Sequence, residues 1–229
     1  MSKIVVISDT HGYHRSVDLP KGDILIHCGD STLSGEIYEY KEFLKWFLTR
    51  DYKHKLLIDG NHEVVVTRLG LTKQLIEEVS KDVMVDNFYY LDNSEAVING
   101  IKFWGSSKTP EFFPEHWVNQ LMTESQAEAC WRLVPEDTDV LITHGPPQGK
   151  LDKVLPFARY DREMAGCPEL LKRVLKVKPK LHCFGHIHKH NGYIQGVNTL
   201  FVNAAICDDS YKTSHKPIVI DTKTWKVVN

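Results

Sequence analysis

The sequence predicts an α/β fold in which two β-sheets pack together with helices on their outer faces. Short runs rich in Val, Ile and Leu alternate with segments of helical periodicity, as in β-α-β units. The middle and the end of the chain contain hairpin patterns, which favour two sheets over one doubly wound parallel sheet. The 229 residues include neither a repeat nor a linker, so we expect one domain over residues 1–229.

Five apolar runs predict buried strands. Each run consists mainly of Val, Ile or Leu and ends at a polar residue or at glycine. Such short runs, bounded by turn residues, are typical of strands inside a sheet. In chain order they are Ile4–Ser8, Ile24–Cys28, Leu56–Ile58, Val140–Thr143 and Leu181–Phe184.

Helical periodicity appears between these runs. Glu36–Leu48 places its apolar residues on one face, which predicts an amphipathic helix. Pro168–Val177 starts with proline, a residue favoured in the first turn of a helix. Thr123–Leu133 and Leu71–Val79 also have helical patterns.

Other segments favour antiparallel pairing. Ala96–Ile98 and Ile101–Trp104 flank Asn99-Gly100, which predicts a hairpin with a two-residue turn. The remaining predicted strands are Tyr193–Ile194, Thr199–Val202, and the pair Ile218–Asp221 and Trp225–Val228 in a closing hairpin around 222–224.

Composition excludes several classes of protein. The 28 Lys and Arg against 30 Asp and Glu give a net charge of −2, so we expect no stable nucleic-acid partner, although a small anionic substrate remains compatible. No stretch approaches the roughly 18 apolar residues of a membrane helix. Residues 1–7 lack the features of a signal peptide, and the five scattered cysteines form no CxxC pair. These features predict a cytoplasmic protein with reduced thiols.

Polar side chains follow each of the five buried strands. The carboxyl ends of strands form the ligand crevice in open α/β sheets, so these segments should converge. Each segment taken alone is a common turn or helix cap, but all five in order predict one site. They are Asp9-Thr10-His11, Gly29-Asp30, Asp59-Gly60-Asn61-His62-Glu63, His144-Gly145 and Gly185-His186-Ile187-His188.

The donor types in these segments indicate a metal site. Two Asp, one Asn and four His form a mixed oxygen and nitrogen set, which suits Mn²⁺, Fe or Zn²⁺ better than Mg²⁺ or Ca²⁺. Seven donors are too many for one tetrahedral zinc ion, but they suit two ions that share a carboxylate. Two ions about 3.5–4 Å apart can hold a phosphoryl group and lower the pKa of bound water to about 7. We expect Gly29, Gly60 and Gly185 to allow tight turns or close backbone approach there.

The order of these motifs resembles that of the calcineurin-like metallophosphoesterase superfamily over nearly the whole chain. Further segments resemble its MPPED subgroup, the metallophosphoesterase-domain-containing proteins. These segments are residues 143–149, 166–171, 179–182 and 203–204. The resemblance implies a four-layer αββα sandwich of two mixed sheets, with metals at the junction of the sheets.

The resemblance also implies a role for each residue of the motifs. Asp30 would bridge two ions. The other expected ligands are Asp9, His11 and His188 for the first ion and Asn61, His144 and His186 for the second. His62 would not be a ligand but would stabilise the phosphate or protonate the leaving oxygen, which suits a side chain that titrates near neutral pH.

The activity that we expect is hydrolysis of small phosphodiesters, with 2′,3′- or 3′,5′-cyclic nucleotides as the leading class. A metal-bridging hydroxide would attack phosphorus while His62 assists the leaving oxygen. Mn²⁺ is the expected ion, with Fe, Zn, Ni and Co as alternatives. A phosphomonoesterase or nuclease on the same site is the alternative activity. A non-catalytic binding scaffold is disfavoured because none of the seven ligands is missing.

Two departures from family patterns refine this interpretation. Phosphoprotein phosphatases of the superfamily carry GDxxDRG, with an Asp that pairs with the catalytic His and an Arg that binds phosphate. Residues 29–35 here are GDSTLSG and lack both, which argues against a protein phosphatase. Some MPPED members have Gly at the first His of GHxH, whereas this chain has His186, so we expect full dinuclear activity.

Several conspicuous residues have simpler interpretations. We expect His27 and His182 to pack beside the motifs, Cys28 and Cys183 to be small buried side chains, and His14 to lie at the surface or in a loop. Core packing is expected for most of the aromatic residues Trp104, Trp117, Trp131, Phe112 and Phe113, with a base-stacking platform among them as the alternative. The basic residues 172–180 should form a solvated helix face. The Phe112-Phe113-Pro114 segment is the aromatic candidate for a substrate wall, and Arg15, Arg159 and Arg162 are candidates to reach a phosphate.

Overall fold

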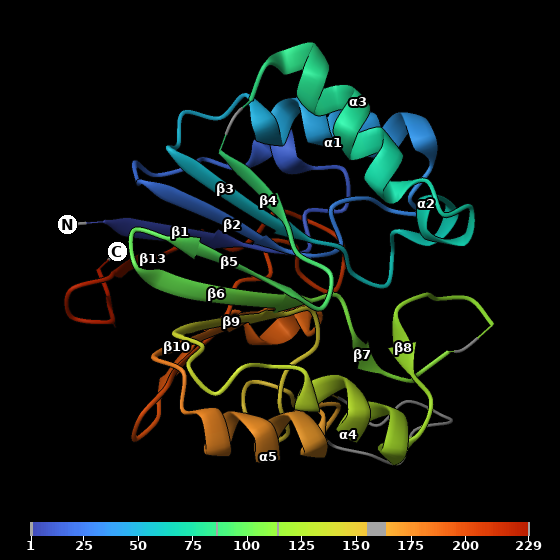
Figure 1. Ribbon diagram of the computed structural model, residues 1–229. Coiled ribbons are helices and arrows are strands. Elements are labelled where there is room, and N and C mark those ends of the chain that lie inside the picture. The colour runs from blue at the N-terminus through green and yellow to red at the C-terminus, as the bar shows by residue number, and fades with distance from the viewer. Residues whose placement is uncertain (1, 86, 114, 155–163, 229) are drawn as a thin grey trace.

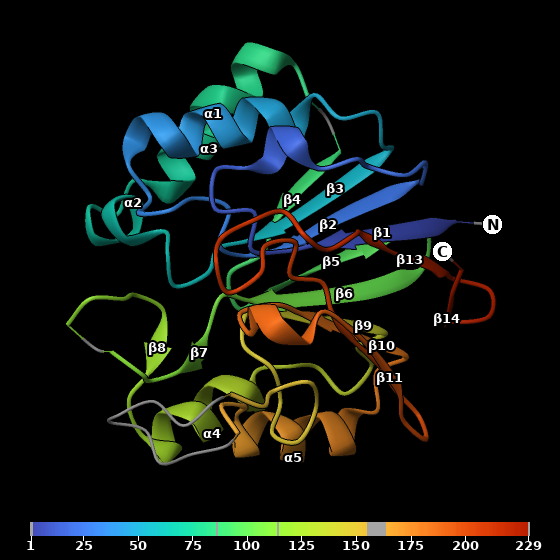
Figure 2. The ribbon, with the colours of Figure 1, turned by 180° about the vertical axis from the view of Figure 1, so that it is seen from behind.

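The computed structural model describes residues 2–85, 87–113, 115–154 and 164–228. Four layers are visible in Figure 1, with helices α1 (Ile37–Leu48) and α3 (Thr72–Val83) above two stacked sheets and α4 (Glu124–Arg132) and α5 (Pro168–Val177) below them. The view from behind shows the same order (Figure 2). The predicted αββα sandwich of two mixed sheets is therefore confirmed. Pro114, Arg159 and Arg162 lie outside the described residues.

The first sheet has the order β14-β13-β1-β2-β3-β4. Strands β1 to β4 run parallel, and β13 pairs antiparallel with both β1 and β14. The short β4 was not among the predicted strands, since three residues are too few to show a period. The strands are β1 (Lys3–Ile7), β2 (Ile24–Cys28), β3 (His54–Ile58), β4 (Phe88–Tyr90), β13 (Ile218–Asp221) and β14 (Lys226–Val227).

The second sheet has the order β11-β12-β10-β9-β6-β5. Its predicted hairpin is confirmed, because β5 pairs antiparallel with β6 and the turn residues Asn99 and Gly100 have φ values of 52° and 77°. Two positive φ values match the turn that best fits the twist of a hairpin. The strands are β5 (Ser94–Ile98), β6 (Ile101–Ser106), β9 (Val140–Thr143), β10 (Leu181–Phe184), β11 (Gly192–Gln195) and β12 (Leu200–Asn203).

Three apolar cores hold the layers together. Alternate residues of β1 point to opposite faces, so that Ile4 and Val6 pack between the sheets while Val5 and Ile7 pack under α1 and α3. A third core lies between the second sheet and α4 and α5, around Trp104. Each fully buried Val or Ile contributes about 1.5–3 kcal/mol relative to an exposed one.

The predicted helices form, α5 with the predicted boundaries and the other three with shifted ones. Helix α3 extends to Val83, four residues beyond the predicted end, because Leu75 and Val79 pack on the core and Met84 ends the helix with a φ of 50°. Thr123 caps α4 by accepting a hydrogen bond from the Gln126 amide at 3.2 Å. Shorter elements are η1 (His14–Ser16), α2 (Val64–Arg68), β7 (Thr109–Pro110), β8 (Gln120–Leu121) and η2 (His188–His190). None of the helices in the described part of the chain is long and apolar enough to cross a membrane.

The two sheets meet at the carboxyl ends of β1 and β12. Ser8, just after β1, forms a parallel bridge with Ala205, and the Ile206 amide donates to the Ser8 carbonyl at 2.9 Å. The segments that follow β1, β2, β3, β9 and β10 consequently share one edge of the sandwich. All five predicted motif segments begin at this edge.

Candidate metal centre

The structure brings the predicted site residues together at the edge where the sheets meet. Three overlapping groups have ligand atoms within 4.8 Å of one another, namely Asp9, His11 and His188, then His11, Asp30 and His62, and finally Asp30, His144 and His186. The eighth predicted residue, Asn61, joins them through its Oδ1, which lies 2.9 Å from Nε2 of His144. Asp30 and His11 each belong to two of the three groups, so that Asp30 shares one group with His11 and His62 and another with His144 and His186.

The closest pairs show how tightly these donors converge. Nε2 of His11 lies 3.0 Å from Nε2 of His188, and the latter lies 3.4 Å from Oδ1 of Asp9. On the other side, Nε2 of His144 lies 3.2 Å from Oδ2 of Asp30. Imidazole nitrogens and carboxylate oxygens of the site residues thus lie close together.

Backbone carbonyls set the orientation of four imidazole rings. A carbonyl only accepts hydrogen bonds, so each Nδ1 must carry the hydrogen, and Nε2 is left to face the cluster. The Nδ1 atoms donate as follows: His11 to Thr32 at 3.1 Å, His62 to Leu33 at 2.7 Å, His144 to Cys28 at 2.9 Å and His188 to Asp208 at 3.1 Å.

Four of the site residues have left-handed backbone conformations, which are costly for residues other than glycine. The φ values are 53° for Asp9, 43° for His11, 54° for Asp30 and 67° for His186. Each such residue costs about 1 kcal/mol or more and persists only where the surroundings hold it. Asp9 and His11 are held because their amides donate to the carbonyls of Gly29 and Asp30, at 2.9 and 3.1 Å.

Glycine is required at two places where the backbone approaches a carboxylate. A Cβ on Gly60 would lie 2.3 Å from Oδ1 of Asp30, and one on Gly185 would lie 2.0 Å from Oδ2 of Asp9. Both distances are far below van der Waals contact, so any side chain would displace a site carboxylate. The expected close backbone approach is confirmed at both positions.

Glu63 organises the loop that carries Asp30, a role that the sequence did not reveal. Its buried carboxylate accepts hydrogen bonds from the amides of Asp30, Thr32 and Gly60, at 3.1, 3.1 and 2.6 Å. It also accepts from the hydroxyls of Ser31 and Thr32, each at 2.9 Å. The Glu of the GNHE motif therefore ties the loop after β2 to the loop after β3. The Gly60-Asn61-His62-Glu63 motif was the sequence feature from which this role of Glu63 could have been found.

Burial and neighbouring charges divide the histidines into two kinds. Burial lowers the pKa of His11 to about 4 and that of His186 to about 3, so both rings are neutral. Burial also acts on His144, but the adjacent Asp30 carboxylate outweighs it and raises the pKa of His144 to about 9. The pKa of His188 is likewise raised by Asp9 in spite of burial. Without a metal, protons on these two rings balance the two buried carboxylates.

His62 lies beside the cluster with its ring held on two sides. It stacks on Trp117 with centroids 4.1 Å apart and meets His11 edge-on at 4.5 Å. Its Nε2 lies 4.0 Å from Oδ2 of Asp30. Trp117 is thus an exception to the core packing expected for most of the aromatic residues. The indole is half-buried and forms one wall of the site.

Two further aromatic rings border the cluster. Phe112, from the segment predicted as a substrate wall, lies 4.9 Å from the His186 ring. Tyr211 was not singled out in the sequence, and it meets His11 edge-on at 4.8 Å and His188 at 5.5 Å. Burial, followed by the charges of Asp30 and Asp9, raises the pKa of Tyr211, so its hydroxyl stays protonated.

Several predicted side chains lie away from the cluster. Arg15 does not point to the site but pairs with Glu42 on α1, with 2.6 Å between its Nε and Oε1. His14, expected at the surface or in a loop, is instead buried in η1 against the same Glu42, 2.8 Å from its Oε2. His27 and His182 pack beside the motifs as expected, where they contact the hydroxyls of Thr10 and Thr143 at 3.1 and 2.9 Å. Cys28 and Cys183 are buried in the core between the sheets.

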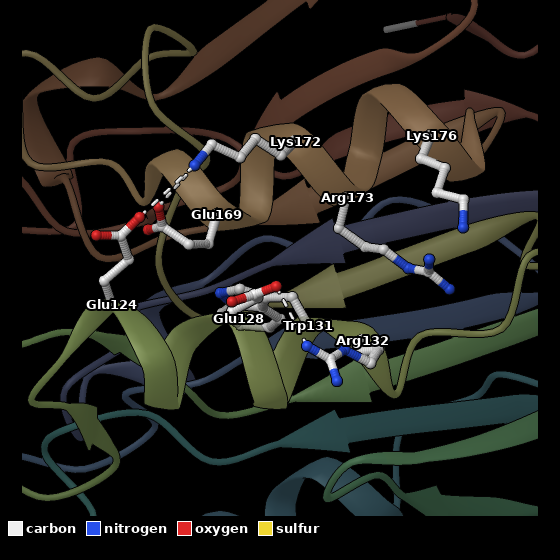
Figure 3. Close-up of a pocket in the computed structure, with 8 residues that line it drawn as sticks. All are labelled: Glu124, Glu128, Trp131, Arg132, Glu169, Lys172, Arg173 and Lys176. Atoms are coloured by element: carbon white, nitrogen blue, oxygen red, sulfur yellow. Dashed lines mark hydrogen bonds and ion pairs between the residues drawn. The ribbon is translucent and has the colours of Figure 1, made fainter.

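The basic residues of α5 border a surface pocket of about 450 Å³ between α4 and α5 (Figure 3). Its charges compensate one another, since Lys172 lies 3.3 Å from Glu169 and Arg132 lies 3.2 Å from Glu128. Both of these ion pairs lie within one helix, whereas Lys172 also reaches across the groove to Glu124 on α4, at 3.8 Å. The charges do not converge on one point, as expected for a solvated helix face. The lining residues are Glu124, Glu128, Trp131, Arg132, Glu169, Lys172, Arg173 and Lys176.

Comparison with known proteins gives matches over most of the chain. The family model described as calcineurin-like phosphoesterase matches residues 2–190. Metallophosphoesterase domain-containing protein 1 of Homo sapiens is 37% identical over 239 residues, which cover 97% of this chain and 72% of that protein. The UPF0046 protein K07C11.7 of Caenorhabditis elegans is 38% identical over 225 residues, which cover 95% and 74%.

Solved structures share the fold at low sequence identity. The protein TT1561 of Thermus thermophilus has a TM-score of 0.65 and 12% identity, over 99% of this chain and 97% of that chain. A structure described as an archaeal phosphodiesterase has a TM-score of 0.50 and 16% identity, over 99% and 97%. These structures show the fold alone, whereas the family model and the sequence relatives show that the chain belongs to the calcineurin-like phosphoesterase family.

Proposed function

We propose that this protein is a phosphodiesterase that uses two divalent metal ions and acts on small phosphodiesters, with cyclic nucleotides as the leading class. The observation that carries this proposal is that the Asp30 carboxylate shares one group of candidate ligand atoms with His11 and another with His144 and His186. The first set consists of Asp9, His11 and His188, and the second of Asn61, His144 and His186. We propose these residues as ligands and Mn²⁺ as the ion, in one cytoplasmic domain over residues 1–229.

The chemistry of the donor set fits such ions. Imidazole nitrogens with carboxylate and amide oxygens suit Mn²⁺, Fe and Zn²⁺. Nδ1 bonds to carbonyls orient His11, His144 and His188 as metal-binding rings are usually oriented. The two buried carboxylates also need compensating positive charge, which divalent ions would provide.

The residues around the donors provide the remaining functions. When bound, two divalent ions supply Lewis-acid stabilisation of the phosphoryl oxygens and hydroxide as a nucleophile at neutral pH. His62 donates through Nδ1 to the Leu33 carbonyl, so a second proton on its ring sits at Nε2. From there it would protonate the leaving oxygen, which avoids a free alkoxide. The His62 amide donates to Oδ1 of Asp30 at 2.8 Å, which fixes the position of the two residues relative to each other.

Aromatic side chains at the site support a substrate that carries a planar base. Tyr211 is 37% exposed, and its ring lies beside the cluster. Phe112 is half-buried next to His186. Stacking of a base on such a ring contributes about 1–3 kcal/mol and tolerates any base. A nucleotide would therefore be held by the base as well as by the phosphate.

Substitution of Tyr211 by alanine should raise KM for 2′,3′-cyclic AMP by about tenfold, because one stacking contact is lost. Glycerol 1,2-cyclic phosphate has the same ring phosphate without a base, so its KM should stay unchanged. Steady-state kinetics on both substrates measures the difference. Tyr193→Ala, which removes an exposed tyrosine from the edge strand β11, is the matched control. Equal losses on both substrates would show that Tyr211 does not contact a base.

The activity itself is tested with bis-p-nitrophenyl phosphate and p-nitrophenyl phosphate, in the presence of EDTA, Mn²⁺, Ni²⁺ or Mg²⁺. We expect cleavage of the diester that EDTA abolishes and Mn²⁺ restores, after which cyclic nucleotides are screened. A preference for the monoester would indicate a phosphomonoesterase instead. Absence of turnover with every metal would overturn the proposal and favour a binding scaffold.

Metal binding should release protons, since a ligand must be deprotonated to bind. The pKa of His144 is raised to about 9 in the metal-free protein, so this ring is protonated at neutral pH. Metal affinity should therefore rise as the pH increases towards about 9 and level off above that value. Calorimetric titration with Mn²⁺ near pH 7.5, in buffers of different ionisation enthalpy, should show release of about one proton or more. Titration without proton release would contradict the assignment of His144.

A further inference from the structure

Glu39 lies outside the donor cluster, yet it contacts the loop that orients two of its histidines. It belongs to the first turn of α1 and is half-buried. Its Oε1 accepts from the Leu33 amide at 2.5 Å, and its Oε2 accepts from the Ser34 amide at 3.3 Å. One carboxylate thus binds two successive N–H groups of the loop after β2.

The same two peptide units bind the histidines through their carbonyls. The unit that ends in the Leu33 amide begins with the Thr32 carbonyl, which accepts from Nδ1 of His11 at 3.1 Å. The unit that ends in the Ser34 amide begins with the Leu33 carbonyl, which accepts from Nδ1 of His62 at 2.7 Å. Hydrogen bonds at the two ends of a peptide unit polarise and strengthen one another.

We infer that Glu39 is a positioning residue that fixes the ring orientation of His11 and His62 through the peptide units 32–33 and 33–34. The carboxylate strengthens both carbonyls as acceptors and holds both peptides in place. Each ring then keeps its hydrogen at Nδ1 and presents Nε2 to the cluster. The consequence for catalysis rests on the function proposed above, whereas the effect on the rings does not.

The rings can be examined directly in the metal-free protein. Long-range ¹H–¹⁵N correlation spectra at pH about 8, where imidazole is mostly neutral, report which ring nitrogen carries the hydrogen. The signals of His11 and His62 are assigned by comparison with the variants His11→Ala and His62→Ala. We expect both rings to be Nδ1–H in the parent protein and at least one to become a mixture in Glu39→Gln. Spectra in which both rings stay Nδ1–H in Glu39→Gln and in Glu39→Ala would overturn the inference.

Kinetics tests the consequence for His62. At saturating Mn²⁺, Glu39→Gln should lower kcat by about tenfold with little change in KM, the lower end of the range for residues that orient site groups. In the His62→Ala background the same change should have no further effect on kcat. A tenfold loss of kcat in both backgrounds would show that Glu39 acts through something other than His62. That result would overturn the inferred effect of Glu39 on His62.

Metal affinity tests the consequence for His11. The Kd for Mn²⁺ should increase by about tenfold in Glu39→Gln, measured by titration without any substrate. The matched control is Glu36→Gln, which removes the same charge from the exposed residue that precedes α1. Glu36→Gln should change neither the spectra, nor kcat, nor the Kd. If it reproduces the effects of Glu39→Gln, the effect is one of net charge and the inference fails. If no variant or parent protein turns over any substrate, the proposed function fails while the spectra and the Kd still decide the role of Glu39.

Discussion

Replacement of Asp30 by alanine should abolish metal binding and hydrolysis together. Asp30 shares a group of candidate ligand atoms with members of both sets of donors, and its Oδ2 is 3.2 Å from Nε2 of His144. Loss of the shared carboxylate removes a ligand from both proposed ions at once. We expect hydrolysis to fall by about 10³-fold or more, since the electrostatic stabilisation of the transition state is lost with the ions.

Asp30→Asn separates the charge of this residue from its shape. The amide oxygen can still accept the His62 amide, which now donates to Oδ1 of the carboxylate, so the loop should keep its conformation. We expect the same loss of metal and activity as in Asp30→Ala, with a smaller change in thermal stability. Metal content by elemental analysis and the melting temperature of each variant provide the measurements.

Asp152→Asn is the matched control for these variants. Asp152 is also a buried carboxylate that accepts backbone amides, from Gly149 and Gly166 at 2.9 and 3.1 Å, but it lies outside the donor groups. It should retain its metal. If Asp30→Asn binds Mn²⁺ as tightly as Asp152→Asn does, the proposed bridging role is wrong.

Replacement of His62 by alanine should have the second largest effect on turnover and none on metal content. His62 is proposed as a proton donor rather than a ligand, and such a group typically contributes about 10²–10⁴-fold to the rate. The loss should depend on the leaving group. An alkoxide from a cyclic nucleotide needs the proton, whereas p-nitrophenolate is stable without it.

The comparison of leaving groups makes this prediction specific. For His62→Ala, kcat should fall by about 10²-fold or more on 2′,3′-cyclic AMP and much less on bis-p-nitrophenyl phosphate. His116→Ala removes an exposed histidine from the neighbouring segment before β8 and should match the parent on both substrates. Equal losses on the two substrates would assign His62 to binding the phosphate, and loss of metal would make it a ligand.

Much of the site was accessible from sequence because the motifs are local. Asp9 and His11, or His186 and His188, lie two residues apart directly after a strand, and strands of this kind are recognised by their apolar runs. Because adjacent parallel strands have their carboxyl ends at the same edge of the sheet, the residues that follow them are expected to lie close together. The fold class was likewise predictable, since β-α-β units and hairpins have distinct patterns. Short elements such as β4 and α2 were missed because they span too few residues to show a period.

Other features depended on contacts between residues far apart in the chain. The sequence around Trp117 does not distinguish it from a core aromatic residue, and only the fold stacks it on His62. Tyr211 lies in a loop without a motif, and only the fold brings this loop, which follows β12, beside His11. Arg15 closely follows the segment Asp9-Thr10-His11 in the sequence, but in the fold it pairs with Glu42 on α1. The local sequence does not indicate which of several possible partners a side chain contacts in the folded protein.

The sequence by itself predicted the candidate donors, their order and the edge of the fold at which they meet. Only the tertiary structure decided how each donor is presented. The left-handed backbone at Asp9 and Asp30, the carbonyls that orient the rings, and the carboxylates of Glu63 and Glu39 that hold the loop after β2 come from contacts between separate segments. The physical reason is that strand formation follows from local apolar pattern. Strained backbone and buried hydrogen bonds, in contrast, are stable only when the rest of the molecule is folded around them.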